Sequence, residues 1–273
     1  MARTTMPKLV SPTGRDIPLK PVRPNAGIEA NYRRRLIALI DHMNASVIYW
    51  VGAAYKANAP IALDASPAME LRSTMRKLTR RWQAKFDKGA DRLGAWFAQK
   101  NKDYSDGSLQ KILKDAGFTV EFKMTSAMND AYQAVIGENV KLIESIASQH
   151  LAKVEVLVMQ SVQQGRDLGA LTESLTKQFG VTKRRAALIA RDQNNKATAT
   201  ITRTRQLGLG ITQAKWRHSS AGKEPRPEHV HFDGQLYDVA KGMYSKVDDE
   251  YVWPGTAINC RCSSAPVIPG FID

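Results

Sequence analysis

Two pairs of side chains near the C-terminus are of the types that bind transition metals. His229 and His231 are separated by one residue, and so are Cys260 and Cys262. Zinc prefers imidazole and thiolate ligands, and four such groups close a tetrahedral structural site. In an extended strand both members of each pair lie on one face, so the spacing is compatible with zinc. We nevertheless predict no cofactor, with histidines satisfied by ordinary hydrogen bonds beside two small buried thiols, and zinc is the alternative.

Carboxylates close to these histidines suggest a second kind of chemistry, that of a metal-dependent nuclease or toxin-like enzyme. They are Asp233, Asp238, Asp248, Asp249 and Glu250. No spacing among them fixes a nucleophile, a base and an oxyanion donor together. We find neither a glycine-rich phosphate loop nor a nucleophile elbow. We therefore predict no catalytic residue and a protein that is not an enzyme, with the nuclease as the alternative.

Positive charge is the strongest feature of the composition. The 273 residues include 40 Lys and Arg against 26 Asp and Glu, a formal net charge of +14. Such a balance favours a polyanionic partner, nucleic acid first. Two basic clusters are candidates for DNA contact, because cations that meet phosphates release counterions. They comprise Arg33, Arg34 and Arg35, and then Arg72, Arg76, Lys77, Arg80, Arg81 and Lys85. The alternative for both clusters is a solvated helix face.

Apolar residues recur at helical spacing over most of the chain, so we predict a mainly α N-terminal region. The small C-terminal module has an α+β or irregular texture, because prolines, glycines and short alternating runs gather there. The expected helices cover residues 28–58, 68–88, 108–116, 126–164, 168–179 and 182–207. Between them we expect a turn at Asp106-Gly107, a short strand or extended link at residues 118–122, and a helix end at Gly180.

The chain divides into four regions by composition. Residues 1–26 hold five prolines and read as an extended basic arm or a disordered start. A basic helical region, 27–122, and a helical domain, 123–210, precede the small module, 211–273. We expect no membrane contact, because we find no run of about 18 apolar residues. With no signal peptide recognised and only two cysteines, we expect synthesis in a reducing cytoplasm.

One combination of short motifs in the C-terminal module is fairly specific. Pro225 to Gly234 contains an Arg-Pro-Glu-His step followed by Asp-Gly, and Trp253-Pro254 leads into Asn-Cys-Arg-Cys. Together with the preceding helices, over roughly residues 125–268, this resembles the phage Mu F-like minor head proteins of the phage head morphogenesis family. The positions that carry the resemblance are Arg226, His229, Asp233, Gly234, Trp253, Asn259, Cys260, Arg261 and Cys262.

The resemblance implies a minor head protein that lies inside the virion and is made in the bacterial host cytoplasm. Its implied partners are the portal protein, the inner capsid or scaffold, and packaged double-stranded DNA. A free, non-specific DNA-binding protein is the other alternative to an enzyme. Some relatives carry Cys-x-x-Cys where this chain has Arg226 and His229, so a four-thiolate zinc site is not expected here.

Three accounts could explain how the C-terminal module holds its shape. The preferred one is a hydrogen-bonded knot around His229, Asp233 and Arg261, in which Asp233-Gly234 makes a turn. Its apolar centre would consist of Trp216, Phe232, Tyr237 and Trp253. Zinc at His229, His231, Cys260 and Cys262 is the second account. A Cys260–Cys262 disulfide is the third, and it would be strained by the one-residue gap.

Overall fold

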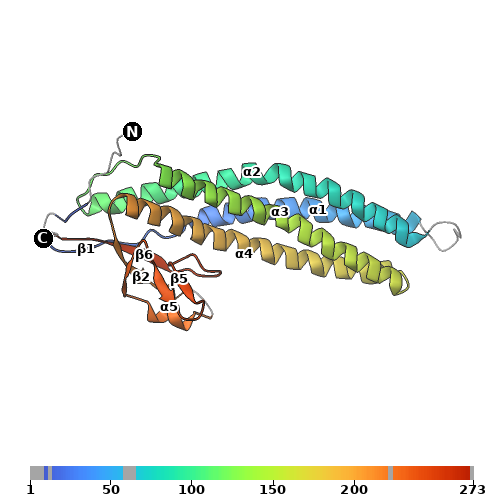
Figure 1. Ribbon diagram of the computed structural model, residues 1–273. Helices are drawn as coiled ribbons and strands as arrows, with labels where there is room; N and C mark the ends of the chain where they lie inside the picture. Colours follow the sequence, from blue (N-terminus) through green and yellow to red (C-terminus); the bar gives the residue numbers. More distant parts are fainter. Residues whose placement is uncertain (1–8, 12–13, 58–65, 221–223, 271–273) are drawn as a thin grey trace. The chain divides into compact units, whose positions relative to one another are not determined.

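The computed structural model describes residues 9–11, 14–57, 66–220 and 224–270 (Figure 1). Four long helices are followed by a small strand-containing C-terminal region, which confirms the predicted fold class. The helices are α1 (Ala26–Ala57), α2 (Pro67–Asp115), α3 (Ser126–Gln163) and α4 (Leu168–Gly208). The chain divides into two compact units, and each long helix contributes residues to both units.

Unit 2 consists of residues 30–95 and 136–190, which are parts of all four long helices. Along α1, apolar residues at steps of three and four are fully buried, including Leu36, Ile40 and Met43. The core of unit 2 also contains polar pairs. The Tyr32 hydroxyl donates to Asn139 Oδ1 at 2.9 Å, and burial raises the Tyr32 pKa.

Side chains at the helix starts satisfy backbone N–H groups that the helices leave without partners. Asn25 Oδ1 accepts from the N–H groups of Gly27 and Ile28 at 2.8 and 3.2 Å. At the start of α4, Asp167 Oδ1 accepts from Gly169 and Ala170 in the same way. Helix α2 begins at Pro67, one residue before its predicted start, since proline suits the first helical position.

Helix α2 is longer than the sequence suggested, and the predicted turn at Asp106-Gly107 is wrong. The helix continues through both residues to Asp115. A tertiary ion pair holds Asp106 in helical conformation: the Arg205 side chain donates from Nε and Nη2 to its two carboxylate oxygens at 2.8 Å each. Residues 118–125 follow without regular secondary structure, so the extended link, and not the strand, is present.

Helix α4 is also continuous, where a break at Gly180 and a new start at Thr182 were expected. The Thr182 hydroxyl donates to the carbonyl of Gln178, one turn earlier, at 3.1 Å. His150 Nδ1 lies 2.8 Å from the same hydroxyl oxygen. Thr182 is therefore a buried helix-interior residue, because these contacts outweigh its preference for a helix start.

Unit 1 consists of residues 1–29, 96–135 and 191–273. Its four-stranded antiparallel sheet has the order β1-β6-β2-β3. The strands are β1 (Ile17–Pro18), β6 (Ser263–Ile268), β2 (Gln213–Arg217) and β3 (Leu236–Asp238). The arm thus supplies an edge strand, with Ile17 opposite Ile268. Residues 1–8 and 12–13 of the arm lie outside the described residues.

The rest of the module is a short helix and a two-stranded hairpin. Helix α5 (Pro227–His231) lies between β2 and β3 in the sequence. Strands β4 (Met243–Ser245) and β5 (Glu250–Val252) pair in antiparallel fashion. The buried cluster of this module includes Trp216, Phe232 and Tyr237, and Trp253 packs against it. The predicted apolar centre is therefore confirmed.

Among the described residues, one helix is long and apolar enough to cross a membrane by length and composition. It is α1, Ala26–Ala57. Helix α1 is nevertheless not an uninterrupted apolar run, because Asp41, His42 and Asn44 lie within it. Leu36, Ile40 and Met43 of α1 are buried in the core of unit 2, whereas Ile48 and Trp50 are exposed. A core helix of a globular protein meets the same criterion.

Candidate functional site

His229, Cys260 and Cys262 come together in unit 1 as a buried cluster. Their potential metal-binding atoms all lie within 4.8 Å of one another. His229 is carried by α5, and the two cysteines directly precede β6. The Nδ1 atom of His229 is 3.4 Å from the Cys260 sulfur and 3.8 Å from the Cys262 sulfur. Both cysteines are free thiols, whereas the third account of the module predicts a disulfide between them.

A fourth potential ligand is His218 and not His231. His218 Nδ1 lies 3.6 Å from the Cys262 sulfur. A cavity of about 80 Å³ is lined by His218, His229, Cys260 and Cys262 among others. His231 is exposed and does not belong to the cluster. The reason is local structure: His229 and His231 lie in a helix, where residues two apart point to different sides.

The pKa values of the two thiols shift in opposite directions, because the two side chains share one proton in a hydrogen bond. A hydrogen bond from the Cys262 side chain is the largest cause that lowers the Cys260 pKa, with His229 and the backbone N–H groups of Cys262 and Gly255 contributing. The same interaction and burial raise the Cys262 pKa. The Gly255 N–H donates to the Cys260 sulfur at 3.3 Å. One sulfur is therefore prepared to carry negative charge.

Polar residues of α4 hold the Asn-Cys-Arg-Cys segment in place. Asp192 Oδ1 accepts from the Asn259 backbone N–H at 3.0 Å, and Arg191 donates to Asn259 Oδ1 at 2.6 Å. The side-chain amide of Asn195 donates to the Cys260 carbonyl at 2.9 Å. Asn259 has a φ of 60°, a backbone conformation that asparagine tolerates better than most residues. Asn259 thus turns the chain so that both sulfurs face the cluster.

Asp233 and Gly234 position His218. Gly234 has a φ of 78°, and the residues form the predicted turn. The Asp233 carboxylate accepts from the His218 backbone N–H at 2.9 Å. The His229 ring thus contacts the two sulfurs while the Asp233 carboxylate binds the backbone of His218, so these two members of the predicted knot have separate partners. The positive charge of Arg261 acts on Asp192, whose pKa is nevertheless raised, mainly by burial.

Glu228 joins α5 to the β4–β5 hairpin, and no pattern in the sequence marks it. Its carboxylate accepts from the Ser245 hydroxyl at 2.6 Å and from the Lys246 backbone N–H at 2.7 Å. The Ser245 hydrogen bond is the main cause that lowers the Glu228 pKa. Arg226 lies 4.0 Å from Asp248 in a half-exposed ion pair. Neither contact involves the cluster of sulfurs.

Trp253 is partly buried and packs against the apolar cluster of the module. Its indole N–H donates to the Val239 carbonyl at 3.0 Å. The Arg203 guanidinium lies 4.1 Å from the ring centroid, a distance at which cation–π attraction operates. Gly242, with a φ of 84°, passes so close that an added Cβ would lie 2.6 Å from the Val252 carbonyl oxygen. Only glycine fits at that position.

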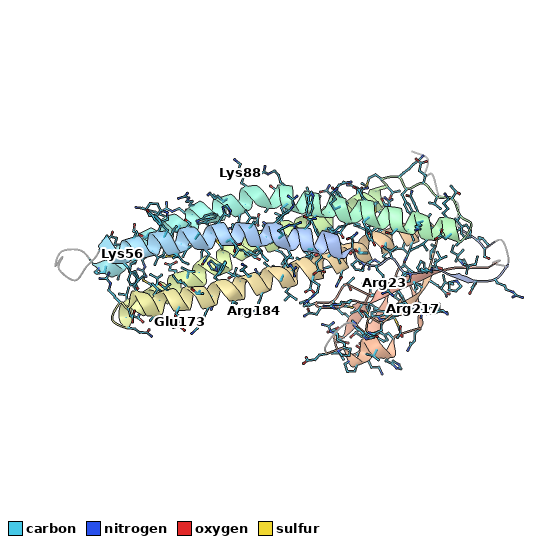
Figure 2. The ribbon with its side chains drawn as sticks, turned by 180° about the vertical axis from the view of Figure 1, so that it is seen from behind. Arg23, Lys56, Lys88, Glu173, Arg184 and Arg217 are labelled. Carbon is cyan, nitrogen blue, oxygen red and sulfur yellow. The ribbon has the colours of Figure 1, made fainter. Side chains whose placement is uncertain are left out.

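The predicted DNA-contacting residues lie on the surface of unit 2. All nine are exposed. Between Leu71 and Phe86, α2 carries six of these cations and no carboxylate. Within the described part of the chain, none of these six is found in an ion pair. Lys85 Nζ lies 4.3 Å from the centroid of the Trp82 ring, and Figure 2 shows Lys88 projecting outward from the same helix.

Unit 1 contains a second basic feature that the sequence did not reveal. A cavity of about 360 Å³ is lined by Arg23, Arg191, Arg217 and Arg261, with Glu29 as its one carboxylate. Arg23 and Arg217 are labelled in Figure 2. These arginines come from four separate segments, so no local cluster in the sequence marks them.

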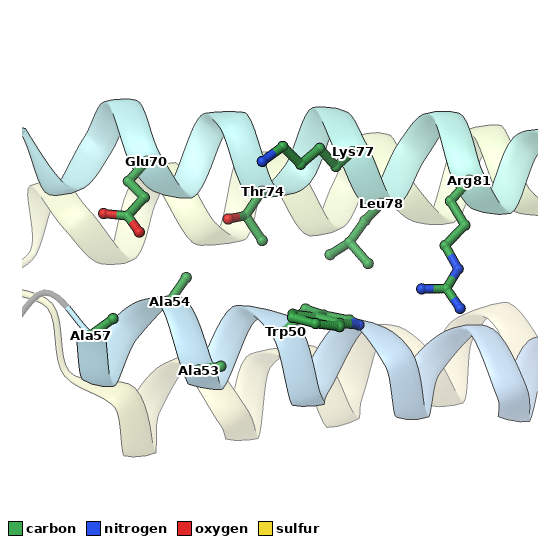
Figure 3. Close-up of a pocket in the computed structure, with 9 residues that line it drawn as sticks. All are labelled: Trp50, Ala53, Ala54, Ala57, Glu70, Thr74, Lys77, Leu78 and Arg81. Atoms are coloured by element: carbon green, nitrogen blue, oxygen red, sulfur yellow. The ribbon is translucent and has the colours of Figure 1, made fainter.

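A larger cavity, of about 430 Å³, lies in unit 2 between α1 and α2 (Figure 3). Three alanines and the Trp50 ring line it on the α1 side, and Glu70, Lys77 and Arg81 project from α2. Tyr49 and Trp50 are exposed and meet edge to face, with ring centroids 5.1 Å apart. Among the described residues that line it, no group is arranged for catalysis.

Comparison with known proteins identifies the region that holds the sulfur cluster. Residues 152–265 match the model of the family described as Phage Mu protein F like protein. This region is similar to the phage Mu F-like proteins. The match confirms the resemblance predicted from the motif, and the phage Mu F-like region contains all nine of the motif's residues. It supports a phage protein of the head morphogenesis type.

The chain is also similar to an uncharacterized protein of Haemophilus influenzae. The two are 28% identical over 258 residues, which is 91% of this chain. The chain spans about half the length of that relative, 55%. No solved structure matches this chain.

Proposed function

We propose that this chain acts as a minor head protein of a phage, inside the virion and in contact with the portal and the packaged DNA. The observation that carries the proposal is the phage Mu F-like region at residues 152–265. Synthesis in the bacterial host cytoplasm and a role in procapsid assembly, genome packaging or delivery belong to the same proposal.

The charge distribution supports the DNA contact. An internal head protein faces phosphate at very high density, and the formal net charge here is +14. The exposed cations of α2 form a stripe without carboxylates, suited to a phosphate backbone. The arginine-lined cavity of unit 1 adds a second basic surface. Because neither surface has an arrangement specific for base edges, we expect sequence-independent binding.

The apolar cavity of unit 2 supports a contact with protein. Exposed aromatic residues beside a hollow are typical of the centre of a protein–protein interface. Trp50 is exposed and lines the 430 Å³ cavity, and the exposed ring of Tyr49 meets the Trp50 ring edge to face. We assign this surface to the portal or the inner capsid, and the basic face of α2 to DNA.

The proposal is tested by co-purification of this chain with its phage's portal protein after complete DNase digestion. We expect the complex to survive digestion, and Trp50→Ala to weaken it while Tyr244→Ala, an exposed residue of unit 1, leaves it unchanged. Loss of all association once DNA is digested would contradict the portal contact and favour a free DNA-binding protein.

A nuclease assay tests the alternative that this protein is a metal-dependent nuclease. We expect no cleavage of double-stranded DNA by the full chain in the presence of Mg²⁺, Mn²⁺ or Zn²⁺. Cleavage that disappears in His229→Ala would overturn the assignment as a non-enzyme.

A further inference from the structure

We propose that His218, His229, Cys260 and Cys262 together bind one Zn²⁺ ion as a closed, structural site. His218 and not His231 is the fourth ligand. The site lies entirely within unit 1, and the inference does not depend on the virion role.

Three separations between potential ligand atoms agree with tetrahedral zinc, although His218 lies outside the group of atoms that are all within 4.8 Å of one another. Zn–S bonds of about 2.3 Å and Zn–N bonds of about 2.0–2.1 Å at tetrahedral angles give N···S separations of about 3.6 Å. The three separations here are 3.4, 3.8 and 3.6 Å. They join His229 to both sulfurs and His218 to Cys262. The nitrogen is Nδ1 in each case, so both rings present the same atom to the site.

The surroundings of the ligands suit a metal ion. The neighbouring protein groups leave part of the hydrogen-bonding capacity of the His229 ring without a partner. His229 is 3% exposed. Within the described residues its Nε2 has no hydrogen-bond partner, and its Nδ1 meets only sulfur. A buried polar ring with so few partners costs folding free energy. Coordination at Nδ1 would compensate for part of that cost. The Gly255 N–H directed at the Cys260 sulfur stabilises the negative charge that a thiolate ligand carries.

The composition of the site indicates a structural role. Four protein ligands fill a tetrahedral shell and leave no position for water or substrate, whereas catalytic zinc keeps one position open. The ligands come from the end of β2, from α5 and from the lead into β6. One ion would therefore tie together three segments of a small module with a limited apolar core.

The test is metal analysis of the full chain purified from zinc-supplemented medium. We expect one zinc per chain by elemental mass spectrometry. After exchange, cobalt should give intense visible bands and thiolate charge-transfer absorption, both typical of tetrahedral sulfur and nitrogen ligands. Cys260→Ser, Cys262→Ser and His229→Ala should lose the ion. His218→Ala should weaken affinity by more than about 100-fold, because removing a residue that only orients a ligand already costs about 10–100-fold.

His231→Ala is the matched control, since this exposed histidine is close in sequence and outside the cluster. It should retain full zinc content and the same cobalt spectrum. Far-UV circular dichroism shows whether each variant keeps its helices, and cobalt titration of the folded wild-type chain gives a readout that does not depend on a variant folding. A folded wild-type chain that binds neither metal would overturn the site. Loss of metal in His231→Ala, or full affinity in His218→Ala, would overturn the assignment of the fourth ligand.

Discussion

The buried ion pair between Asp106 and Arg205 allows a sharp test of how unit 1 is held together. The Arg205 side chain is 5% exposed and that of Asp106 is 14% exposed. Two hydrogen bonds of 2.8 Å join them, and Arg205 also donates to the Lys123 carbonyl at 2.6 Å. Asp106→Asn keeps the shape of the side chain and removes its charge. The buried guanidinium then lacks its counter-charge, which costs roughly 3–5 kcal/mol when one partner of a buried pair is removed.

Asp103→Asn is the matched control, because it makes the same chemical change one turn away in the same helix. Asp103 is 53% exposed, and its contact with Lys102, whose side chain is 17% exposed, is a partly exposed ion pair at 3.2 Å. Such pairs contribute about 0–1 kcal/mol. The assay is urea denaturation at pH 7 followed by circular dichroism, with the free energy of unfolding compared across the wild type and both variants. Equal losses in the two variants would refute the assignment of Asp106 as a buried anchor of α2.

Three further predictions address the surface, the core and the pH response. When glutamine replaces Arg72, Arg76, Arg80 and Lys85, DNA affinity should depend less steeply on salt, by about 0.9 in logarithmic slope for each phosphate that is no longer neutralised. Lys177→Gln should not change the slope, because Lys177 pairs with Glu173 at 2.6 Å. Trp216→Ala should cost roughly 3–5 kcal/mol in urea denaturation, as for other buried aromatic residues, and Trp253→Ala less, because its ring is only partly buried. Burial lowers the His150 pKa to about 4, so the unfolded chain binds a proton first as pH falls. The wild type should lose roughly 2–3 kcal/mol more than His150→Gln between pH 7 and pH 4.5, and an equal loss in both would refute the shift.

The local sequence pattern was sufficient to predict the long helices and the residues at the apolar centre of the module. Leu36, Ile40 and Met43 follow helical spacing and are buried. Trp216 and Phe232 are large apolar residues in a region with few others, and both are in the core. The resemblance to phage Mu F-like proteins rested on a motif whose residues do lie together in unit 1.

The errors arose where distant contacts override local preference. Asp106-Gly107 has the chemistry of a turn, but the ion pair to Arg205, 99 residues away, keeps it helical. The pairing of His231 with His229 as possible ligands assumes a strand, in which both point to one face, whereas the segment is the short helix α5. His218 has no partner in its own vicinity of the sequence, and Cys262, its neighbour in space, is 44 residues away. No spacing rule would have paired them.

The most direct test of the proposed role is quantitative mass spectrometry of purified phage particles after external protease treatment. The proposed role predicts that this chain is present in few copies and resists the protease until the heads are opened. Its absence from the particles, or its digestion while the heads are intact, would contradict an internal head protein.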